Sequence, residues 1–523
     1  MVNLSGVRAV AAVRRHLVPR DASATVSRAT LSRRGAEPVP PLSQVTVGQG
    51  HPSDERHSTM TEHQGQITLG DDTVAELAGR TEGSVFAPGD AGYVAAIAGF
   101  NLRSQHRPCL VVAAAGVADV QAAVTFAAAR DLPVGVVATG HQPFPTSEGF
   151  LLITTSAMRT IEIDAERAVA RVGAGARWSD VVEPAQEAGL APLNGSSPLV
   201  GVVGFTLGGG LSPFLGRSFG WAADHVAAIE VVTPDGALRR VSAEAEPELF
   251  WGLCGGRSNF GVVTELEIGL FPVTSFYGGG IFFPAENAEA VLRAFPEVVR
   301  DAPNAFTCSV ALLNFPPVPE VPELLRGRFL AHVRVTHLGS DEEAEKLIAP
   351  FRAIGQGVLD TVGRHPYSAF PLVHSDPVDP FPYEDEGTLL AELPAKAVES
   401  LVESAQVAAG GLVTVLEVRH LGGALAVRPA GASPVAARDA VFNVWGATVG
   451  PPEVVDAGMA MLGGMVERLS PWSTGLTYTN FAGRDDRAQN VFTVDDLERL
   501  RVLKRQYDPR NLFRVNNHNI APE

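Results

Sequence analysis

Apolar and polar positions follow two periods along this chain, and the changes between them mark its elements. Residues 119–130 (DVQAAVTFAAAR) carry apolar side chains at helical spacing, and residues 132–138 form a short apolar run typical of a strand. Residues 262–271 alternate like a half-buried strand, and residues 226–241 hold two apolar runs around a Pro-Asp-Gly turn, which predicts a hairpin. The chain before residue 273 is therefore expected to mix helices with strands.

The pattern changes after Pro272. Between residues 274 and 475, strand-like and helix-like segments follow one another, and proline-rich joints interrupt them. We expect strands at 307–313, 328–336 and 413–420, helices at 288–299, 341–354, 395–407 and 435–448, and joints at 315–322 and 377–382. This mixture predicts an α+β domain built on an antiparallel sheet. A charged helix is expected at 494–507.

The first 59 residues differ from the rest in composition, with eight Arg, no Lys and four acids. They show no sustained periodicity, so we expect residues 1–69 to be a disordered extension. The Arg14-Arg15 pair is typical of twin-arginine signals, but no apolar segment of about 7–15 residues follows it, so export is not expected. We expect a cytoplasmic protein. The sequence around Met60 is typical of an ordinary start, and translation from there is an alternative.

The net charge of the 523 residues is −17, from 41 basic and 58 acidic side chains. This sign disfavours nucleic acids and anionic membranes as partners. No apolar run reaches roughly 18–20 residues, the length that spans a bilayer. Cys109, Cys254 and Cys308 are too few and too widely spaced for a disulfide framework or a cysteine metal site. We expect no metal site, and the oligomeric state stays open.

Two glycine loops carry the candidate chemistry. The first is Thr139-Gly140-His141, directly after the expected strand 132–138, and the second runs from Gly201 to Gly210 (GVVGFTLGGG). Glycine lets a backbone approach a ligand closely and adopt positive φ. The spacing does not fit the GxGxxG fingerprint of dinucleotide-binding folds, and no Walker, HExxH or CxxC motif occurs. The loops indicate a large phosphate-bearing cofactor with His141 beside it, although a lone loop histidine is more often structural.

Four segments and one short element give the chain its resemblance to a known family. They are 136–142 (VVATGHQ), 197–210 (SPLVGVVGFTLGGG), 248–264 (ELFWGLCGGRSNFGVVT), the closing 507–520, and Tyr478-Thr479-Asn480-Phe481. In this order and spacing they resemble the motifs of the PCMH-type FAD-dependent oxidases, the vanillyl-alcohol-oxidase superfamily. Within it, the chain is most similar to the berberine-bridge-enzyme-like branch. The resemblance covers residues from about 80 to 520.

The resemblance implies a two-domain PCMH-type FAD-binding fold of the α+β class. The FAD-binding domain would comprise 70–273 and 476–523, around an antiparallel-sheet substrate domain at 274–475. It also implies FAD joined to His141 by an 8α-histidyl bond, with backbone N–H groups of Thr139 and Gly140 on the pyrophosphate. By resemblance, the other cofactor-binding residues are Val137, Ala138, Gln142, Ser197, Val200, Gly201, Gly204, Phe205, Gly208, Gly209, Gly210, Asn259, Gly261, Val262, Asn480 and Asn517.

Some positions depart from the family pattern or bear on its chemistry. Many members bind FAD a second time through a Cys before Pro, where this chain has Ser197, so no cysteinyl link is expected. Cys254 stands where the family usually has Arg, and Ser258 where it has Gly. Val200 occupies a place where the family's Val accompanies ready access of O2 to the flavin. A core valine without a gating role is the alternative.

The resemblance implies an oxidase that moves a hydride from a small alcohol, phenol or natural product to the flavin, with O2 reoxidising the flavin to give H2O2. Removal of the substrate's O–H proton requires a base. Tyr478 is the first candidate and Glu417 the second. Alternation places Glu417 and Arg419 on one face of their strand and His420 on the other.

Alternatives accompany each of these roles. Tyr478 could be a packing residue, and Glu417 with Arg419 a surface pair. Tyr367, Tyr383, His365 and Trp445 are further candidates for lining the pocket. A dehydrogenase with another electron acceptor, a monooxygenase-like tailoring enzyme and a flavin-carrying binding protein without turnover are the alternative functions.

Overall fold

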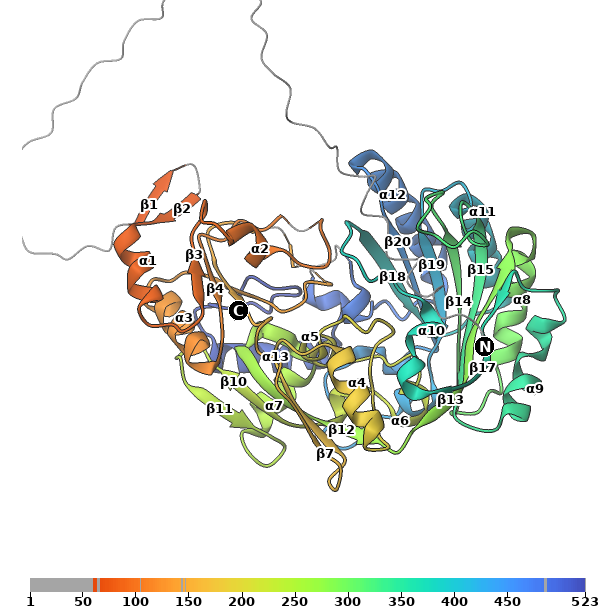
Figure 1. Cartoon of the computed structure of the whole chain (residues 1–523), viewed down its shortest axis with the longest axis horizontal. Coiled ribbons are helices and arrows are strands. Elements are labelled where there is room, and N and C mark those ends of the chain that lie inside the picture. The colour runs from red at the N-terminus through yellow and green to blue at the C-terminus, as the bar shows by residue number, and fades with distance from the viewer. Residues whose placement is uncertain are drawn as a thin grey trace, which may run out of the picture.

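The computed structural model describes residues 60–63, 66–103, 105–142, 144–145, 147–483 and 487–522. Within these ranges the chain forms three larger sheets and one hairpin (Figure 1). The hairpin pairs β1 (Met60–His63) with β2 (Gln66–Leu69), inside the stretch expected to be disordered. The rest of that expected extension, residues 1–59, lies outside the described residues.

One edge strand of the first sheet leads directly into the loop that carries His141. Its order is β3 (Ser84–Phe86), β4 (Leu110–Ala113), β6 (Leu151–Thr154) and β5 (Val134–Val137), with β4, β6 and β5 parallel to one another. Helices α1 (Asp71–Ala78), α2 (Tyr93–Ile97) and α3 (Val117–Ala129) accompany it. The strands are short apolar runs because packed side chains cover them, as expected of a parallel sheet.

The second sheet is antiparallel and supports the glycine loop. Its order is β11 (Leu238–Val241), β10 (Val226–Val232), β12 (Val262–Phe271), β8 (Val169–Gly173) and β7 (Ile161–Asp164), and β9 (Ala191–Pro192) also pairs with β12. The predicted hairpin at 226–241 is confirmed as β10 and β11. Helices α4 (Trp178–Glu187), α5 (Val202–Leu207), α6 (Gly216–Phe219) and α7 (Pro247–Gly256) belong to this part of the chain.

The third sheet is the antiparallel sheet predicted for the second domain. Its order is β16 (Leu359–Asp360), β13 (Ser275–Pro284), β15 (Phe329–His337), β14 (Phe306–Asn314), β19 (Val415–His420), β20 (Phe442–Thr448) and β18 (Glu384–Leu390), and β17 (Gly363–Pro366) also pairs with β13. Helices α8 (Ala288–Val299), α9 (Asp341–Arg352), α11 (Ala395–Ala408) and α12 (Pro452–Leu469) cover its outer face (Figure 1).

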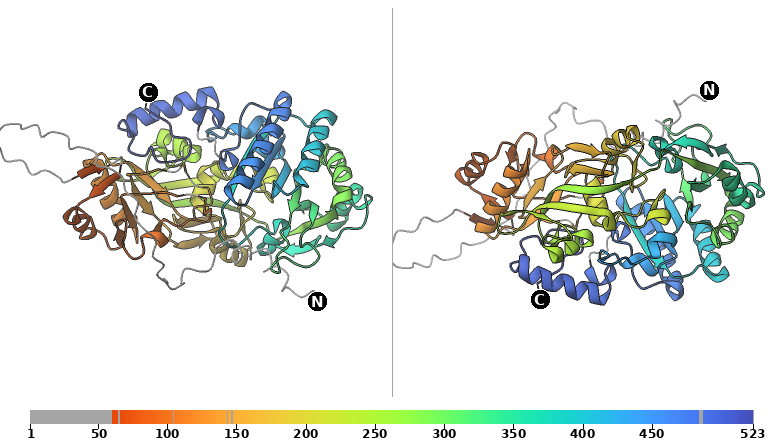
Figure 2. Two further views of the ribbon diagram at one scale, coloured as in Figure 1. Left: turned by 90° about the horizontal axis from the view of Figure 1, so that it is seen from above. Right: turned by 90° about the horizontal axis from the view of Figure 1, so that it is seen from below.

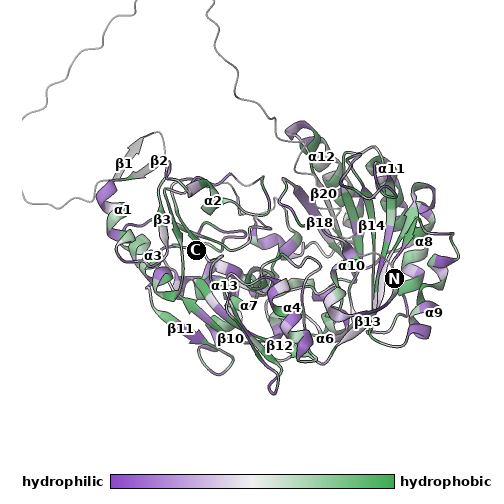
Figure 3. Ribbon diagram, in the orientation of Figure 1, coloured by the Kyte–Doolittle hydropathy of each residue, from purple (hydrophilic) through white to green (hydrophobic). Residues whose placement is uncertain are grey.

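Alternation along these strands separates an apolar face from a polar one. On β15, Val333 and Val335 enter the core beneath the helices, whereas Arg334 points to the opposite face. On β19, Leu416 and Val418 enter the same core, and Glu417 and Arg419 face away from it. Figure 3 shows the strands of this sheet as largely hydrophobic and α9 as largely hydrophilic. The polar face is therefore turned toward the rest of the molecule.

One predicted helix is wrong. Residues 435–448 form a short 3-10 turn (Ala436–Asp439) followed by strand β20, because the β-branched and aromatic residues of FNVWGAT pair between β19 and β18. The short helix α10 (Pro371–His374) follows β17. The α+β class and the antiparallel second domain are both confirmed.

The end of the chain returns to the first domain. Helix α13 (Val494–Tyr507) packs its leucines against α7 (Figure 2). Beyond it, the backbone N–H of Val134 donates to the carbonyl of Leu512 at 2.9 Å, so the C-terminal segment lies along β5. No helix in the described ranges is long and apolar enough to cross a membrane, and no three ligating side chains there are grouped for a metal.

Candidate functional site

A large cavity, of about 1710 Å³, lies between the two glycine loops and the polar face of the third sheet. The first domain contributes residues 136–142, most of 195–207, and Arg257. The third sheet and its loops contribute Arg334, Asp376, Asp385, Glu417, Arg419 and Trp445. The cavity therefore has one wall of loop backbone and another of charged and aromatic side chains.

The loop after β5 is held in place by a second segment of backbone. The N–H groups of Phe100 and Asn101 donate to the carbonyls of Thr139 and Gly140, at 2.8 and 3.0 Å. Gly140 has φ +65°, and a Cβ there would lie 2.6 Å from the Cα of Gly99. Glycine is therefore required at this position both by the backbone angle and by the close approach.

His141 lines the cavity, and one of its ring nitrogens has no hydrogen-bond partner among the described residues. Its ring stacks on Phe100, with centroids 4.0 Å apart, and its Nδ1 lies 3.0 Å from Oγ1 of Thr139. Nε2 is buried and has no hydrogen-bond partner in the described part of the chain. Burial, helped by the charge of Arg177, lowers the pKa of His141 to about 3. The imidazole is thus neutral at physiological pH, the form in which a ring nitrogen is nucleophilic.

The second glycine loop begins with a helix. Gly201 precedes α5, and its backbone N–H donates to Oγ1 of Thr139 at 3.3 Å, so the two loops are joined. Gly204 and Phe205 on α5 line the cavity, and so do Ser197 and Val200 before it. Ser197 carries a hydroxyl that accepts the N–H of Leu199 at 3.3 Å. The chain thus offers no thiolate here for a second flavin bond.

The three consecutive glycines that follow α5 do not line the cavity but pack behind it. A Cβ on Gly208 would overlap Oδ1 of Asn480. A Cβ on Gly209 would lie 3.3 Å from the ring of Tyr478, and Gly210 lies against Ala222. Gly209 and Gly210 also have φ of +108° and +74°. These glycines therefore let the Tyr478 element approach the loop backbone.

The Tyr478 element forms a network around a buried cation. Oη of Tyr478 accepts the backbone N–H of Leu211 at 2.8 Å and Nδ2 of Asn480 at 3.0 Å. Nη2 of Arg257 donates to Oδ1 of Asn480 and, at 2.6 Å, to Oε1 of Gln142. Burial raises the pKa of Tyr478 to about 12, against the opposing effect of these donors. The residue is a neutral phenol at physiological pH.

Arg257 is a functional candidate that motif matching missed, because it occupies a variable position of the GGRSNFG segment. Burial lowers its pKa to about 10, and its Nε has no partner within the described residues. No carboxylate there forms an ion pair with it. A buried cation of this kind requires an anion, and the diphosphate of FAD would supply one. The free Nε2 of His141 and this cation both fit the expected cofactor.

The remaining predicted cofactor residues divide into two groups. Asn259 is 1% exposed, and its Oδ1 accepts the N–H of Ile520 at 2.9 Å, so it fastens the C-terminal segment. Val262 lies in the apolar core. Neither lines the cavity. The predicted residues that do line it are Val137, Ala138, Thr139, Gly140, His141, Gln142, Ser197, Val200, Gly201, Gly204, Phe205, Gly261, Asn480 and Asn517.

Glu417 is held by two arginines. Its carboxylate oxygens lie 3.0 and 3.1 Å from Nη2 of Arg419, and Nη1 of Arg334 is 3.2 Å from Oε1. These cations overcome the effect of burial and hold the pKa of Glu417 at about 2. The group is a permanent carboxylate engaged on both oxygens. That position suits an ion-pair partner better than a proton acceptor near neutral pH.

Asp385 and Tyr383, on and before β18, were not singled out as catalytic by any motif. Oδ2 of Asp385 accepts Nε1–H of Trp445 at 2.7 Å, and burial raises its pKa to about 6. Tyr383 donates its hydroxyl to the backbone carbonyl of His141. Among the other aromatic candidates, His365 lines the cavity, whereas Tyr367 is fully buried behind it. Cys254 is likewise buried in the core.

Family models match two parts of the chain. The model described as an FAD binding domain matches residues 108–242, and the one described as berberine and berberine like matches residues 477–521. The first stretch includes both glycine loops, and the second begins at the Tyr478 element. The matches therefore fall on the segments that line or support the cavity.

Similar proteins cover both domains. (R)-6-hydroxynicotine oxidase of Paenarthrobacter nicotinovorans is 28% identical over 464 residues, which are 84% of this chain and 97% of the relative. FAD-dependent monooxygenase prx3 of Penicillium roqueforti is 34% identical over 195 residues, 36% of this chain and 38% of that protein. A solved structure of 6-hydroxy-D-nicotine oxidase from Arthrobacter nicotinovorans aligns with a TM-score of 0.73 at 26% identity, covering 85% of this chain and 98% of its own.

Proposed function

Because the chain belongs to the berberine-bridge-enzyme-like branch of the PCMH-type FAD oxidoreductases, we propose that it is an oxidase with one covalent flavin bond, at His141. The observation that carries the proposal is the neutral His141 ring, which lines the cavity and whose buried Nε2 has no partner among the described residues. The bond would replace one hydrogen of the 8α-methyl group. One methyl C–H bond would be exchanged for an N–C bond, the hydrogen would leave as a proton, and O2 would take the two electrons released.

When bound, FAD supplies a two-electron acceptor, which takes a hydride from the substrate carbon and returns two electrons to O2 to give H2O2. The residues of this chain bind and orient. Backbone N–H groups of the 138–142 loop would bind the diphosphate, and Arg257 would offer it a positive charge. Val200 lines the cavity at the place where O2 would approach. The Phe100 ring fixes the plane of His141.

The proton released from the substrate requires an acceptor on the cavity wall. Asp385 has the most suitable pKa, about 6, because a base is most effective when its pKa lies near the working pH. Glu417 is already neutralised by two arginines, and Tyr478 is a neutral phenol whose oxygen accepts two N–H donors. We therefore assign proton removal to Asp385. Tyr478 holds the loop and Asn480 in position.

The test of covalent attachment needs no substrate. Purified protein is denatured in acid, washed, and examined for absorption near 450 nm and for intact mass, with His141→Ala in parallel. We expect the colour and the mass of FAD to stay with the wild type and to be absent from the variant. If flavin washes out of the wild type, the covalent bond is disproved. If protein expressed with ample FAD never contains flavin, the oxidase proposal itself fails.

A second experiment separates the oxidase from its alternatives. The holoenzyme is offered a panel of alcohols, phenols and N-heteroaromatic compounds, and peroxide is measured against substrate consumed. One peroxide per substrate supports the oxidase. Incorporation of oxygen-18 from O2 into product would instead indicate a monooxygenase, as the name of the prx3 relative suggests. Reduced flavin that reacts only slowly with air would indicate a dehydrogenase.

A further inference from the structure

The polar face of the third sheet forms one wall of the cavity, called the substrate wall below. It carries two arginines and one carboxylate, that of Glu417, which is ionised beside them. Arg334 on β15 and Arg419 on β19 are 6% and 4% exposed, and both line the cavity. They share the carboxylate of Glu417, which lies between them at 3.2 and 3.0 Å. Two cations against one anion leave a formal excess of one positive charge in a buried position, where charge is costly unless it is paired.

The titratable groups that neighbour this cluster are two histidines and Asp376, and Asp385 lines the same wall. His332 and His374, from β15 and α10, are buried, and burial beside the arginines holds their pKa values well below the usual range, so both are neutral. Asp376, after α10, also lines the cavity, and burial raises its pKa although Arg334 acts in the opposite direction. Burial thus opposes the ionisation of Asp376, whereas the charges of Arg334 and Arg419 favour it.

The same wall holds polar atoms that lack partners. Both ring nitrogens of His374, which is 4% exposed, are buried without a hydrogen bond within the described ranges, and Nε2 lies 4.0 Å from Oε1 of Glu417. An unpaired buried donor or acceptor costs about 1–3 kcal/mol. A bound ligand with an oxyanion would satisfy several of these groups at once.

Apolar side chains also line this wall. Phe282, Leu313, Phe315 and Trp445 line it around the charged cluster. We propose that the substrate is an aromatic or otherwise apolar molecule carrying a carboxylate, or a similar oxyanion, and that Arg334 and Arg419 bind that group. This inference rests on the proposed oxidase function and specifies its substrate class. Arginine suits the task because its planar N–H groups match the two oxygens of a carboxylate.

The two arginines of the wall also bear on ligands of the opposite charge. A protonated amine beside Arg334 and Arg419 would be repelled, because like charges in a medium of low dielectric interact strongly. The inference therefore predicts poor binding of cationic amines here.

The test compares acids with their neutral esters on the FAD-loaded enzyme. Probes are 4-hydroxyphenylacetate and 4-hydroxycinnamate, each with its methyl ester, and binding is followed by the change in flavin absorption. We expect at least one acid to bind ten-fold or more tightly than its ester. Arg419→Gln and Arg334→Gln should reduce that ratio to about one, and Arg419→Lys should keep part of it. Arg364→Gln, which removes the surface pair with Asp341, should leave the ratio unchanged.

Two readouts keep the outcomes apart. Flavin content and melting temperature show whether each variant is folded and loaded before binding is interpreted. An ester that binds as tightly as its acid, an unchanged preference in both glutamine variants, or absence of binding by every acid to fully loaded enzyme would overturn the inference. Enzyme that holds no FAD would contradict the proposed function instead.

Discussion

The phenolic Oη of Tyr478 lies 2.8 Å from the backbone nitrogen of Leu211, the residue that follows the glycine triplet. This hydrogen bond joins the last part of the chain to the loop that packs on the cofactor cavity. It exists because Gly209 and Gly210 let the loop backbone come within reach of the ring. Tyr478 is thus a structural link between two sequence motifs more than 250 residues apart.

Tyr478→Phe should therefore lower the free energy of unfolding, although it removes only one hydroxyl group. The backbone N–H of Leu211 and Nδ2 of Asn480 would both lose an acceptor in a site where Tyr478 is 2% exposed. We expect a loss of about 1–3 kcal/mol in the free energy of unfolding by urea. Tyr507→Phe is the matched control, because it removes a half-buried hydroxyl that donates to Glu246 at 3.1 Å. Its loss in the free energy of unfolding should be less than about 1 kcal/mol, which is about half of that expected for Tyr478→Phe. Equal losses in the two variants would contradict this account.

Proton removal by Asp385 predicts a pH dependence. The folded protein raises the pKa of this carboxyl to about 6, so the ionised, proton-accepting form appears as pH rises through 6. Stopped-flow rates of flavin reduction, with a substrate from the peroxide panel, should rise through that pH and then level off. Asp385→Asn should lose this limb and be slowed by about 10²–10⁴.

The stability of the same variant provides the control. A raised pKa stabilises the fold at low pH, and that contribution is lost as pH rises through about 6. Asp385→Asn removes the ionisation and should be at least as stable as the wild type at pH 8, so a slow variant could not be explained by unfolding. A rate limb that survives in Asp385→Asn would assign proton removal elsewhere, with Tyr478 as the next residue to test.

Gly208 provides a test of how the glycine loop works. Gly208→Ala would place a Cβ on Oδ1 of Asn480 and beside Nη2 of Arg257, so the network must move. We expect weaker retention of flavin after gel filtration of non-covalent protein carrying His141→Ala, and a lower melting temperature. Gly116→Ala is the control, since its φ is −163° and nothing lies within 4 Å of an added Cβ. Tight flavin binding in Gly208→Ala would contradict the role assigned to this glycine.

The sequence predicted the parts of the site that lie in continuous motifs. The His141 loop and the helix-opening Gly201 both line the cavity as the spacing indicated. The role of the glycine triplet in cofactor contact stays a prediction, because a motif shows where the backbone must pass closely but not what it passes. In the fold, Asn480, Tyr478 and Ala222 occupy that space.

The substrate wall could not be predicted in the same way, because sheet register assembles it. Alternation correctly placed Glu417 and Arg419 on one face of a strand. Their partner Arg334 comes from β15, which is separated from β19 by β14. No local sequence pattern predicts that these strands lie in this order. Asp385 and Trp445 likewise meet only because β18 pairs with β20. The helix predicted at 435–448 failed for the same reason, since tertiary pairing outweighed its helical spacing.

Glu417→Gln should reveal the buried ion cluster through stability. Removing the shared carboxylate leaves Arg334 and Arg419 buried without a counter-ion, which costs about 3–5 kcal/mol when a buried pair is broken. The pKa of Glu417 is lowered to about 2, so its contribution is present above the usual carboxyl pKa and is lost as pH falls toward 2. The difference between wild type and variant in urea unfolding should therefore shrink below pH 4. A constant difference down to pH 2 would contradict the ion-pair account.

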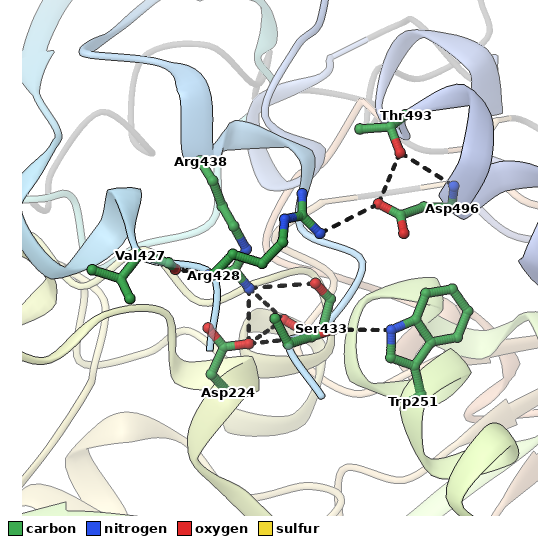
Figure 4. Close-up of polar contacts among 9 residues, drawn as sticks. Asp224, Trp251, Val427, Arg428, Ser433, Arg438, Thr493 and Asp496 are labelled. Carbon is green, nitrogen blue, oxygen red and sulfur yellow. Dashed lines mark hydrogen bonds and ion pairs between the residues drawn. The ribbon is translucent and has the colours of Figure 1, made fainter. Parts of the chain in front are cut away.

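A second buried pair fastens residues 427–438 of the substrate domain to the first domain (Figure 4). Nη2 of Arg438 lies 2.8 Å from Oδ1 of Asp224, with both side chains under 10% exposed, and Ser433 donates its N–H and hydroxyl to the same oxygen. Nearby, Nε1 of Trp251 donates to the carbonyl of Ala432 at 3.0 Å. The cluster holds Val435 against Gly209, directly behind the glycine loop.

Arg438→Met should cost about 3–5 kcal/mol, because it leaves the carboxylate of Asp224 buried without its cation. Arg428→Met, drawn in the same view, removes a half-exposed arginine 4.0 Å from Asp496 and should cost less than about 1 kcal/mol. Urea unfolding of the two variants at pH 7 measures the difference. Because the cluster supports the glycine loop, Arg438→Met should also bind flavin less tightly than Arg428→Met does. Equal stability and equal flavin binding in the two variants would contradict a role of the Arg438–Asp224 pair in holding the domains together.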